Sequence, residues 1–458
     1  GEWESCVSPL VMTDLVLGAH WFQVAAVDAA GRADLTTPAS HRWWIQPPPP
    51  DAIAPDTEML SGPDLMTVLP GATFTFAGTD NQTDAADLKY ECRLDGAMTA
   101  PPNPTELWTA CTAPYTLAGP LPVGNRVLQV RAKDLAGNAD ATPASYAWTI
   151  GPAPVPRLVG CGMTITVSII VTNNLTDCLG HGLIIGANGI TIDLNGKIID
   201  GKDIGAAIMN NGYDYVTVKN GRVTGFDYGV MLNKGTTNNV VESVQAQVNQ
   251  EAGVALGQPH APPDPNLPPV PEEPPPGITS QVKDNVIRTN SIVGNKRGVW
   301  IANETQRTLV TDNLIGASGS EGVWIERSSQ NRVEGNDIQS SSQPAVVLEG
   351  SNENTVLDNS LSGNGGGVSI GLTTTGTTIG IPSNDNVAEG NLILESGGPG
   401  LEVVGSTGND LVDNVVTDSN GEAIELYNAQ QTLIKGNDVR GNKGGIGLKG
   451  STGNHIEG

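Results

Sequence analysis

Four residues of this chain combine aromatic rings with carboxylates at a nearly constant spacing: Trp300, Trp324, Glu326 and Glu349. Exposed tryptophans beside carboxylates are typical of surfaces that stack sugar rings. A pair of carboxyls can also hydrolyse a glycosidic bond, with retention when they lie about 5 Å apart and with inversion at roughly 6.5–9.5 Å. Glu326 and Glu349 are therefore the candidate catalytic pair, and Trp300 and Trp324 the candidate sugar-binding residues.

A second acidic group follows downstream. Glu402, Glu425 and Tyr427 repeat the same spacing and are further candidates for ligand binding. Like charges stacked directly over one another repel, which would suit a Ca²⁺ ion between Glu402 and Glu425. No other cofactor is expected.

A structural interpretation competes with each of these sites and is favoured over them. Aromatic residues on adjacent strands stabilise a sheet by stacking, and outward acidic residues keep an elongated protein soluble. The five histidines, at positions 20, 41, 181, 260 and 455, are scattered. They therefore predict no zinc or copper site built on histidine.

A periodic asparagine indicates which elements would position these residues. It occurs at Asn290, Asn313, Asn336, Asn359, Asn391, Asn414 and Asn437, with steps of 23 residues and one step of 32. A repeat of this length predicts stacked supersecondary units. We expect the Asn side chains to form an internal ladder at a corner, and the extra residues of the long step to form a loop within 371–383.

Each unit contains short segments in which apolar residues alternate with variable ones, as in Gly298–Ile301 and Gly322–Ile325. This alternation predicts strands with one buried face. Copies would stack about 4.8 Å apart. One outward column would then contain Trp300, Trp324, Glu402 and Glu425, and the next would contain Glu326, Glu349 and Tyr427.

The segment from Cys161 to Cys178, followed by Gly189–Gly196, resembles the opening of right-handed parallel β-helix repeat proteins. That group includes polysaccharide lyases, uronate epimerases, pectinases and a periplasmic copper-associated family. The resemblance covers about residues 158–458 and implies the fold more than the activity. Gly180-His181-Gly182 is similar to a polygalacturonase tripeptide, but the paired aspartates of that family are missing.

The N-terminal third contains an internal repeat offset by 105 or 106 residues. Asp28-Ala29-Ala30-Gly31 matches Asp134-Leu135-Ala136-Gly137, and 37–43 matches 142–148. The run Val130-Arg131-Ala132-Lys133-Asp134-Leu135-Ala136-Gly137-Asn138 resembles the tandem Ig-like modules of large secreted bacterial proteins. We therefore expect half of an Ig-like module in residues 1–46 and a complete one in residues 55–151.

Cysteine positions predict two disulfides, Cys92–Cys111 within one module and Cys161–Cys178 at the start of the β-helix. Cys6 matches Cys111, and its partner would lie upstream of residue 1. The sequence also stops part-way through a coil. We therefore expect a piece of a longer protein, truncated at both ends.

Proline-rich stretches divide the chain. Residues 47–54 and 152–157 are expected to be stiff linkers, and 258–279 an exposed insertion in the β-helix of 158–458. The formal net charge of −25 argues against nucleic acid as a partner, and no apolar run is long enough to insert into a membrane.

These features predict an all-β protein: a right-handed parallel β-helix with 23-residue coils, preceded by Ig-like β-sandwich modules. Disulfides and low Lys content indicate an extracellular or cell-surface location. The favoured role is structural or adhesive, in which the β-helix, or a filament built from it, presents a face to polysaccharide or to copies of itself. The alternative is a carbohydrate-active enzyme, a polysaccharide lyase or glycoside hydrolase, that uses the Trp/Glu face.

Overall fold

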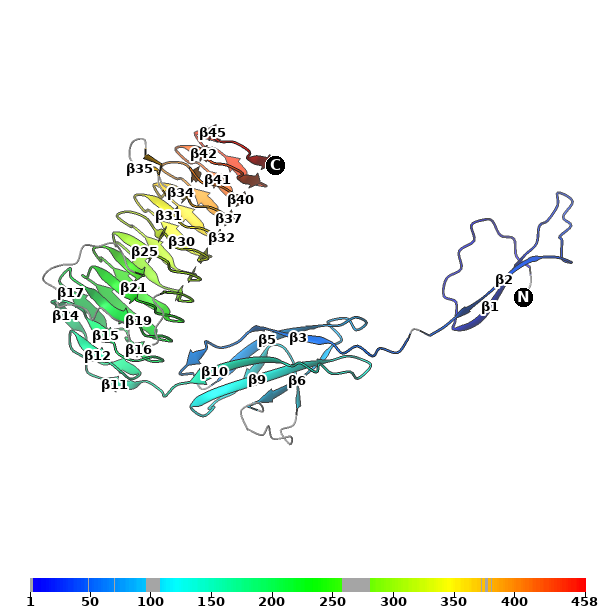
Figure 1. The fold of residues 1–458 in the computed structure, drawn as a ribbon, viewed down its shortest axis with the longest axis horizontal. Coiled ribbons are helices and arrows are strands. Elements are labelled where there is room, and N and C mark those ends of the chain that lie inside the picture. Colours follow the sequence, from blue (N-terminus) through cyan, green and yellow to red (C-terminus); the bar gives the residue numbers. More distant parts are fainter. Residues whose placement is uncertain are drawn as a thin grey trace. The chain divides into compact units, whose positions relative to one another are not determined.

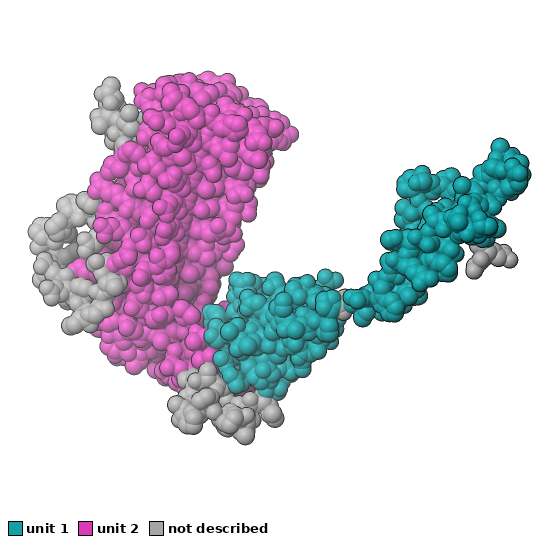
Figure 2. Space-filling model, turned by 45° about the vertical axis from the view of Figure 1, so that its right-hand side comes forward, with its two compact units in different colours: residues 1–61, 74–115, 128–146 teal, residues 62–73, 116–127, 147–458 magenta. Residues whose placement is uncertain are grey.

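A computed structural model describes residues 3–47, 49–69, 71–95, 108–257, 281–371, 373–374, 378–379 and 381–458. The chain divides into two compact units, residues 1–61, 74–115 and 128–146, and residues 62–73, 116–127 and 147–458 (Figure 2). Every regular element in those described residues is a β-strand, and no helix able to span a membrane occurs there. The expected Pro-rich insertion at 258–279 lies outside them.

The larger unit is a parallel β-helix of about 11 coils (Figure 1), which confirms the predicted fold class. One of its two long sheets has 12 strands. Its strands are β12(Met163–Ile165), β15(Leu183–Ile185), β18(Ala206–Asn211), β20(Tyr228–Asn233), β22(Ala252–Leu256), β25(Arg297–Ala302), β28(Val323–Glu326), β31(Pro344–Glu349), β34(Gly366–Ile370), β39(Leu401–Val404), β42(Glu422–Tyr427) and β45(Gly444–Lys449).

The other long sheet has 22 strands. They are β11(Val155–Arg157), β13(Ile169–Val171), β14(Leu175–Cys178), β16(Thr191–Asp193), β17(Ile198–Gly201), β19(Thr217–Thr224), β21(Val240–Gln247), β23(Val286–Arg288), β24(Ser291–Val293), β26(Leu309–Thr311), β27(Leu314–Gly316), β29(Arg332–Glu334), β30(Asp337–Gln339), β32(Thr355–Leu357), β33(Ser360–Ser362), β37(Val387–Glu389), β38(Leu392–Leu394), β40(Asp410–Val412), β41(Val415–Thr417), β43(Leu433–Lys435), β44(Asp438–Arg440) and β46(His455–Glu457).

The periodic asparagine lies at a corner between two short strands, as Asn290 does between β23 and β24. The residue before it has a positive φ: 55° at Thr289, 54° at Asp312 and 63° at Gly335. Asp and Gly adopt this left-handed conformation at the lowest cost, which explains why they recur there. The chain therefore turns sharply at each ladder position.

The asparagine ladder is confirmed. The backbone N–H of Asn313 and its Nδ2 both donate to Asn336 Oδ1, at 3.0 and 2.9 Å. The Nδ2 of Asn336 donates to the carbonyl of Val310 one coil away at 2.8 Å. Because each amide connects neighbouring coils, the buried amide groups of the ladder keep their hydrogen-bond partners.

The sequence analysis missed further ladders, which lie at other positions within each coil and recur with the same spacing. Asn331 N and Nδ2 donate to Asn354 Oδ1, at 2.8 and 3.1 Å, and Asn354 continues to Asn386 across 32 residues. A third ladder is made by serines, with Ser328 N donating to Ser351 Oγ at 3.1 Å. Their shared 23-residue spacing was the available signal.

Inward side chains between these ladders form one continuous apolar core. Val299, Ile301, Val323, Ile325 and Val346 are all fully buried on the inner face of the 12-stranded sheet. Burying a Val or Ile stabilises a fold by roughly 1.5–3 kcal/mol. The strands therefore keep their alternation because a shift of one residue would expose this set.

The long step of the repeat leaves the coil pairing intact. Val368 of β34 pairs with Leu401 of β39, and the strands β35(Thr373–Thr374) and β36(Thr378–Ile379) pair only with each other. The additional residues therefore lie outside the coils, as the sequence predicted, although residues 372, 375–377 and 380 are outside the described part.

Residues 56–150 contain strands that fit a β-sandwich. A three-stranded sheet is built from β3(Asp56–Ser61), β5(Ala72–Thr79) and β8(Tyr115–Leu117). The facing strands are β4(Met66–Thr67), β10(Ala144–Ile150), β9(Gly124–Lys133), β6(Lys89–Leu94) and β7(Thr109–Cys111). The fold fits the predicted sandwich class, but it does not by itself identify an Ig-like module.

The internal repeat has a structural counterpart. The antiparallel pair β1(Gly18–Val24) and β2(Ala39–Ile45) corresponds in position to β9 and β10. An isolated bridge joins Val27 to Ala33, and the equivalent bridge joins Lys133 to Ala139.

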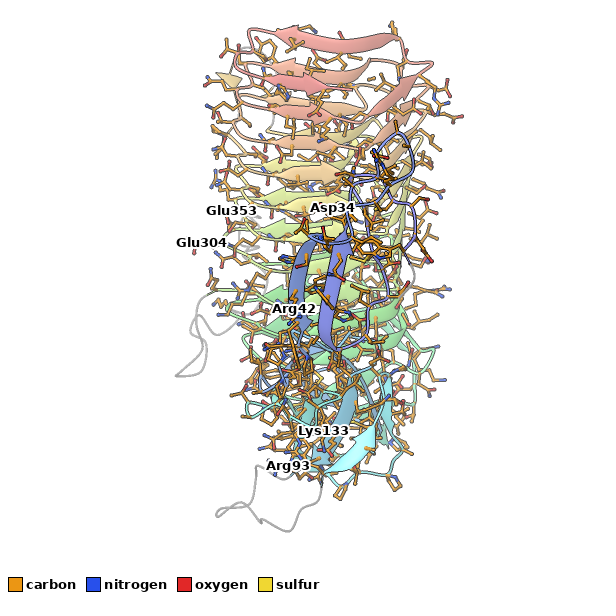
Figure 3. All side chains as sticks on the ribbon, turned by 90° about the vertical axis from the view of Figure 1, so that its right-hand side faces the viewer. Asp34, Arg42, Arg93, Lys133, Glu304 and Glu353 are labelled. Carbon is orange, nitrogen blue, oxygen red and sulfur yellow. A yellow bond between two sulfur atoms is a disulfide. The ribbon has the colours of Figure 1, made fainter. Side chains whose placement is uncertain are left out.

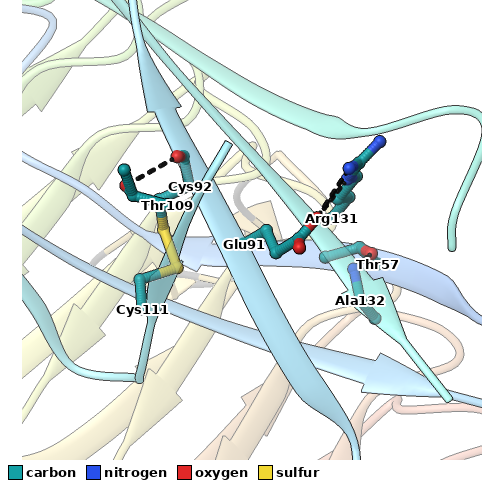
Figure 4. Close-up of a disulfide and its surroundings, with 7 residues drawn as sticks. All are labelled: Thr57, Glu91, Cys92, Thr109, Cys111, Arg131 and Ala132. Carbon is teal, nitrogen blue, oxygen red and sulfur yellow. Dashed lines mark hydrogen bonds and ion pairs between the residues drawn. A yellow bond between two sulfur atoms is a disulfide. The ribbon is translucent and has the colours of Figure 1, made fainter. Parts of the chain in front are cut away.

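Both predicted disulfides are present. Cys92–Cys111 joins β6 to β7 with the Cα atoms 5.8 Å apart (Figure 4). Cys161–Cys178 joins the turn before β12 to the last residue of β14, with the Cα atoms 5.5 Å apart. Cys6 is free and exposed. Disulfides of this kind are typical of proteins outside the cytoplasm.

Candidate functional site

The outward side chains of the 12-stranded sheet form a continuous column, here called the outer column. Strand pairing places its members in register, one per coil: Met209, Met231, Ala255, Trp300, Trp324, Val347, Ser369, Glu402, Glu425 and Gly447. Glu326 pairs with Glu349, and Val404 pairs with Tyr427, in the adjacent column. The predicted alignment of the candidate residues is therefore correct.

Trp300 and Trp324 stack on each other, with ring centroids 5.0 Å apart and planes inclined by 17°. The guanidinium of Arg297 lies 4.6 Å from the Trp300 ring and 4.5 Å from the Trp324 ring. Trp300 is only 5% exposed. The expectation of an exposed aromatic platform was therefore wrong for Trp300, because the neighbouring ring and a cation already occupy its surroundings.

Arg297 is held over the rings by two carboxylates. Its Nε lies 3.0 Å from Glu321 Oε2, and one terminal nitrogen lies 3.3 Å from Glu251 Oε2. The Arg297 side chain is 14% exposed. Cation–π contacts are stronger in such desolvated settings, so this arrangement stabilises the outer face. Sequence reasoning missed Arg297; its place three residues before Trp300 was the only signal.

A second, smaller apolar cluster surrounds this stack. It contains Met209, Met231, Ala252, Ala255 and Ala302, all less than 10% exposed, together with Trp300. The outer column is thus apolar and closed from Met209 to Trp300. This part of the sheet contributes to stability and offers little to a ligand.

Glu326 and Glu349 lie beside the tryptophans on neighbouring strands. The indole N–H of Trp300 donates to Glu326 Oε2 at 3.2 Å. Burial raises the pKa of Glu349, and the charge of Glu326 raises it further, while Arg327 and the indole of Trp324 oppose the change. The Trp324 N–H is buried and forms no hydrogen bond. Its effect on the Glu349 pKa is therefore that of a nearby dipole, without a hydrogen bond between the two groups.

Glu402 and Glu425 form a second carboxyl pair with opposite environments. Burial raises the pKa of Glu402, and the Glu425 charge adds to this, whereas the Ser369 hydroxyl, which donates to Glu402 Oε2 at 2.9 Å, lowers it. Glu425 Oε1 lies 2.5 Å from Lys449 Nζ. The pKa of one carboxyl is thus raised by its surroundings, while its neighbour is paired with a cation.

The predicted Ca²⁺ site between Glu402 and Glu425 gains no support, because Lys449 already compensates this pair. Lys449 also lies 3.6 Å from Glu422. Tyr427 is 41% exposed and remains available for contact. Other carboxylates, including Glu304 and Glu353, project from the edge of the coil stack (Figure 3).

Comparison with known families gives one match. The family model described as periplasmic copper-binding protein (NosD) matches residues 276–385 and 371–458. Soft or imidazole ligands bind copper, but residues 276–458 contain no Cys, no Met and a single histidine, His455. The side chains of this region therefore do not fit a copper site, and the match is to the repeat.

Several solved structures are similar to parts of this chain at a low level. Tailspike protein 2 of an Escherichia coli bacteriophage is 11% identical over 69% of this chain and 43% of its own, with a TM-score of 0.40. The A-module of the mannuronan C-5 epimerase AlgE4 of Azotobacter vinelandii is 17% identical over 64% of this chain and 82% of its own, with a TM-score of 0.39.

An alginate lyase of Paenibacillus sp. is 12% identical over 65% of this chain and 98% of its own, with a TM-score of 0.39. No curated protein matches the chain. Likeness at this level assigns no activity. The chain is thus a parallel β-helix protein whose C-terminal repeats match the NosD family model.

Proposed function

We propose that this is an extracellular or cell-surface protein whose β-helix binds polysaccharide along the downstream half of the outer column. The observation that carries the proposal is that polar side chains lie on five successive strands in two adjacent columns. Ser369, Glu402 and Glu425 are in register in the outer column, and Glu326, Glu349 and Tyr427 belong to the column beside it. Adjacent strands lie about 4.8 Å apart. Hydrogen-bonding groups repeated at this spacing along two neighbouring columns suit an extended polymer that carries hydroxyl groups.

Charge favours a neutral polysaccharide. The chain carries a formal net charge of −25, and these two columns are themselves acidic. Repulsion of like charge disfavours polyanions such as pectate or alginate. Tyr427 supplies an exposed aromatic ring in place of Trp300.

The test is retention of the full chain on insoluble neutral polysaccharides, with pectate and alginate gels for comparison. We expect retention on a neutral polymer, weakened about tenfold or more in the Glu402→Gln/Glu425→Gln variant, because hydrogen bonds to charged groups contribute roughly 1.5–3 kcal/mol. The matched control is Glu389→Gln/Glu395→Gln, which makes the same charge change at exposed residues away from these columns.

Equal loss in both double variants, or no retention on any neutral polymer, would contradict the proposal. Self-association is the competing role. It predicts sedimentation that depends on protein concentration in the absence of polysaccharide, and no effect of the Glu402→Gln/Glu425→Gln change on retention.

A second candidate function is glycoside hydrolysis, favoured by the opposed environments of Glu402 and Glu425. Glu402, with its raised pKa, would donate a proton to the glycosidic oxygen while the Glu425 carboxylate attacks the anomeric carbon. Water would then release the sugar from Glu425, and Glu402 would take the water proton. Strand spacing favours the shorter carboxyl separation of retaining enzymes, and the same holds for Glu326 and Glu349.

Hydrolysis is tested by measuring new reducing ends in the same incubations. Enzymatic cleavage predicts that Glu402→Gln abolishes product while the polymer is still retained. If cleavage instead requires Glu349, the upstream pair is the active one. Retention without new reducing ends in the parent protein leaves binding alone.

A further inference from the structure

Three aspartates converge at one end of the β-sandwich. Asp51 precedes β3, Asp80 follows β5 and Asp134 follows β9. One carboxylate oxygen of each lies within 4.8 Å of the others. Asp134 is only 5% exposed. One buried and two partly buried carboxylates are therefore held close together, and their negative charges repel one another.

Two of these carboxylates have an oxygen that is left without a partner. Asp51 Oδ1 accepts from the N–H of Ile53 at 3.1 Å, and Asp80 Oδ2 accepts from the N–H groups of Gln82 and Thr83 at 3.0 and 2.7 Å. The other oxygens, Asp51 Oδ2 and Asp80 Oδ1, are closed off from solvent and have no hydrogen bond. Buried acceptors of this kind call for a ligand.

The internal repeat provides a natural comparison. Asp28 corresponds to Asp134, and Arg32 corresponds to Asn138. Asp28 accepts from the backbone N–H and the Nε of Arg32, both at 2.9 Å, while Asp134 accepts from the backbone N–H and Nδ2 of Asn138, both at 2.7 Å. The hydrogen bonds are equivalent, but the arginine charge is replaced by a neutral amide.

The copy that contains Asn138 thus lacks the arginine charge, and Asp51 and Asp80 bring two further carboxylates to Asp134 there. None of the three aspartates forms a salt bridge with a Lys or Arg in the described ranges. A bound cation would supply the compensating charge that Arg32 supplies in the first copy.

We propose that Asp51, Asp80 and Asp134 bind a Ca²⁺ ion that ties the segment preceding β3 to the loops following β5 and β9. Ca²⁺ binds carboxylate and carbonyl oxygens at about 2.3–2.6 Å, so two of its ligand oxygens lie up to roughly 5 Å apart. The observed convergence meets this limit. Zinc and copper are disfavoured because the three ligands are all carboxylates.

The test is calorimetric titration of the EDTA-treated full chain with CaCl₂, together with thermal unfolding with and without Ca²⁺. We expect saturable binding and a higher Tm in Ca²⁺, because a ligand that binds only the folded state stabilises it. Equal binding and stabilisation by Mg²⁺ at the same concentration would overturn the assignment to Ca²⁺.

The key variant is Asp80→Asn, because an asparagine Oδ1 can still accept from Gln82 and Thr83 while its amide faces the cluster. We expect this variant to fold and to bind Ca²⁺ about tenfold more weakly or worse. Two controls locate the ion: Asp28→Asn, at the position that corresponds to Asp134, and Glu402→Gln/Glu425→Gln, at the acidic pair of the β-helix. Ca²⁺ binding unchanged in Asp80→Asn, or lost in either control, would refute the site.

Discussion

The outer column of the 12-stranded sheet changes character along its length. From Met209 to Trp300 it is apolar and closed from solvent. From Ser369 to Glu425 it is polar: the Ser369 hydroxyl donates to Glu402, and Glu425 forms an ion pair with Lys449 of the adjacent column. Strand pairing and the inner column of Val, Ile and Leu are the same in both halves.

The difference shows that stacking of the coils restricts the residue types on the inner face of the strands and leaves those on the outer face unrestricted. Inward positions must fill the core and continue the ladders, so they change little from coil to coil. Outward positions are free to vary, as expected of a scaffold on which a site can be placed. Function is therefore to be sought where the outer column becomes polar.

The largest loss of stability is expected from substitutions in the asparagine ladder, which runs through both the apolar and the polar half of the β-helix. Asn336→Ala removes the acceptor for the backbone N–H and Nδ2 of Asn313 and the donor to Val310. Because buried groups left unpaired cost about 1–3 kcal/mol each, we expect the free energy of unfolding to fall by about 4 kcal/mol. Asn414→Ala in the downstream half should cost a similar amount in urea unfolding.

The matched control for the ladder is Asn420→Ala, at an exposed position, with an expected change below about 0.5 kcal/mol. A clear difference between the Asn336 and Asn414 variants would show that the two halves do not share one internal architecture.

The apolar half should respond through stability and the polar half through binding. Trp300→Ala removes a buried ring that contacts Trp324 and Arg297, and we expect a loss of about 3 kcal/mol in the free energy of unfolding. Tyr427→Ala, at a 41% exposed position, should change stability by less than about 1 kcal/mol but weaken polysaccharide retention. If Trp300→Ala instead removed retention and left stability unchanged, the comparison of the two halves would fail.

The smallest effect concerns pH. The pKa of Glu402 is raised in the folded state above the ordinary value of 4.5, so the folded protein binds this proton more tightly than the unfolded chain does. Linkage then requires this group's contribution to stability to be present below about pH 4.5 and to fall as the pH rises through the folded-state pKa.

We expect the Glu402→Gln variant to lose this pH dependence, so that its stability relative to the parent improves between pH 4 and pH 7. Thermal unfolding across that range measures the difference. Glu389→Gln, at an exposed carboxyl, should follow the parent. If Tm plotted against pH for Glu402→Gln ran parallel to the parent curve, the raised pKa of Glu402 would be contradicted.

The sequence alone was sufficient for the coil, the corner ladder, the outward columns and the two disulfides. The first three depend on local alternation or on a spacing repeated many times, so that an error at one coil is corrected by the next, whereas the disulfides depend on two pairs of cysteines that lie close together in the sequence. The steps from Asn290 to Asn437 and the segment Gly322–Ile325 illustrate this. The candidate pairs Glu326 with Glu349 and Glu402 with Glu425 were aligned correctly for the same reason.

Only the tertiary structure decided which outward residues are accessible and which charges meet. Burial of Trp300 under Arg297 depends on side chains from neighbouring turns, and the convergence of Asp51, Asp80 and Asp134 joins three loops with no periodic relation. Such encounters depend on how distant segments pack, whereas hydrophobic periodicity reports only on the backbone that carries them.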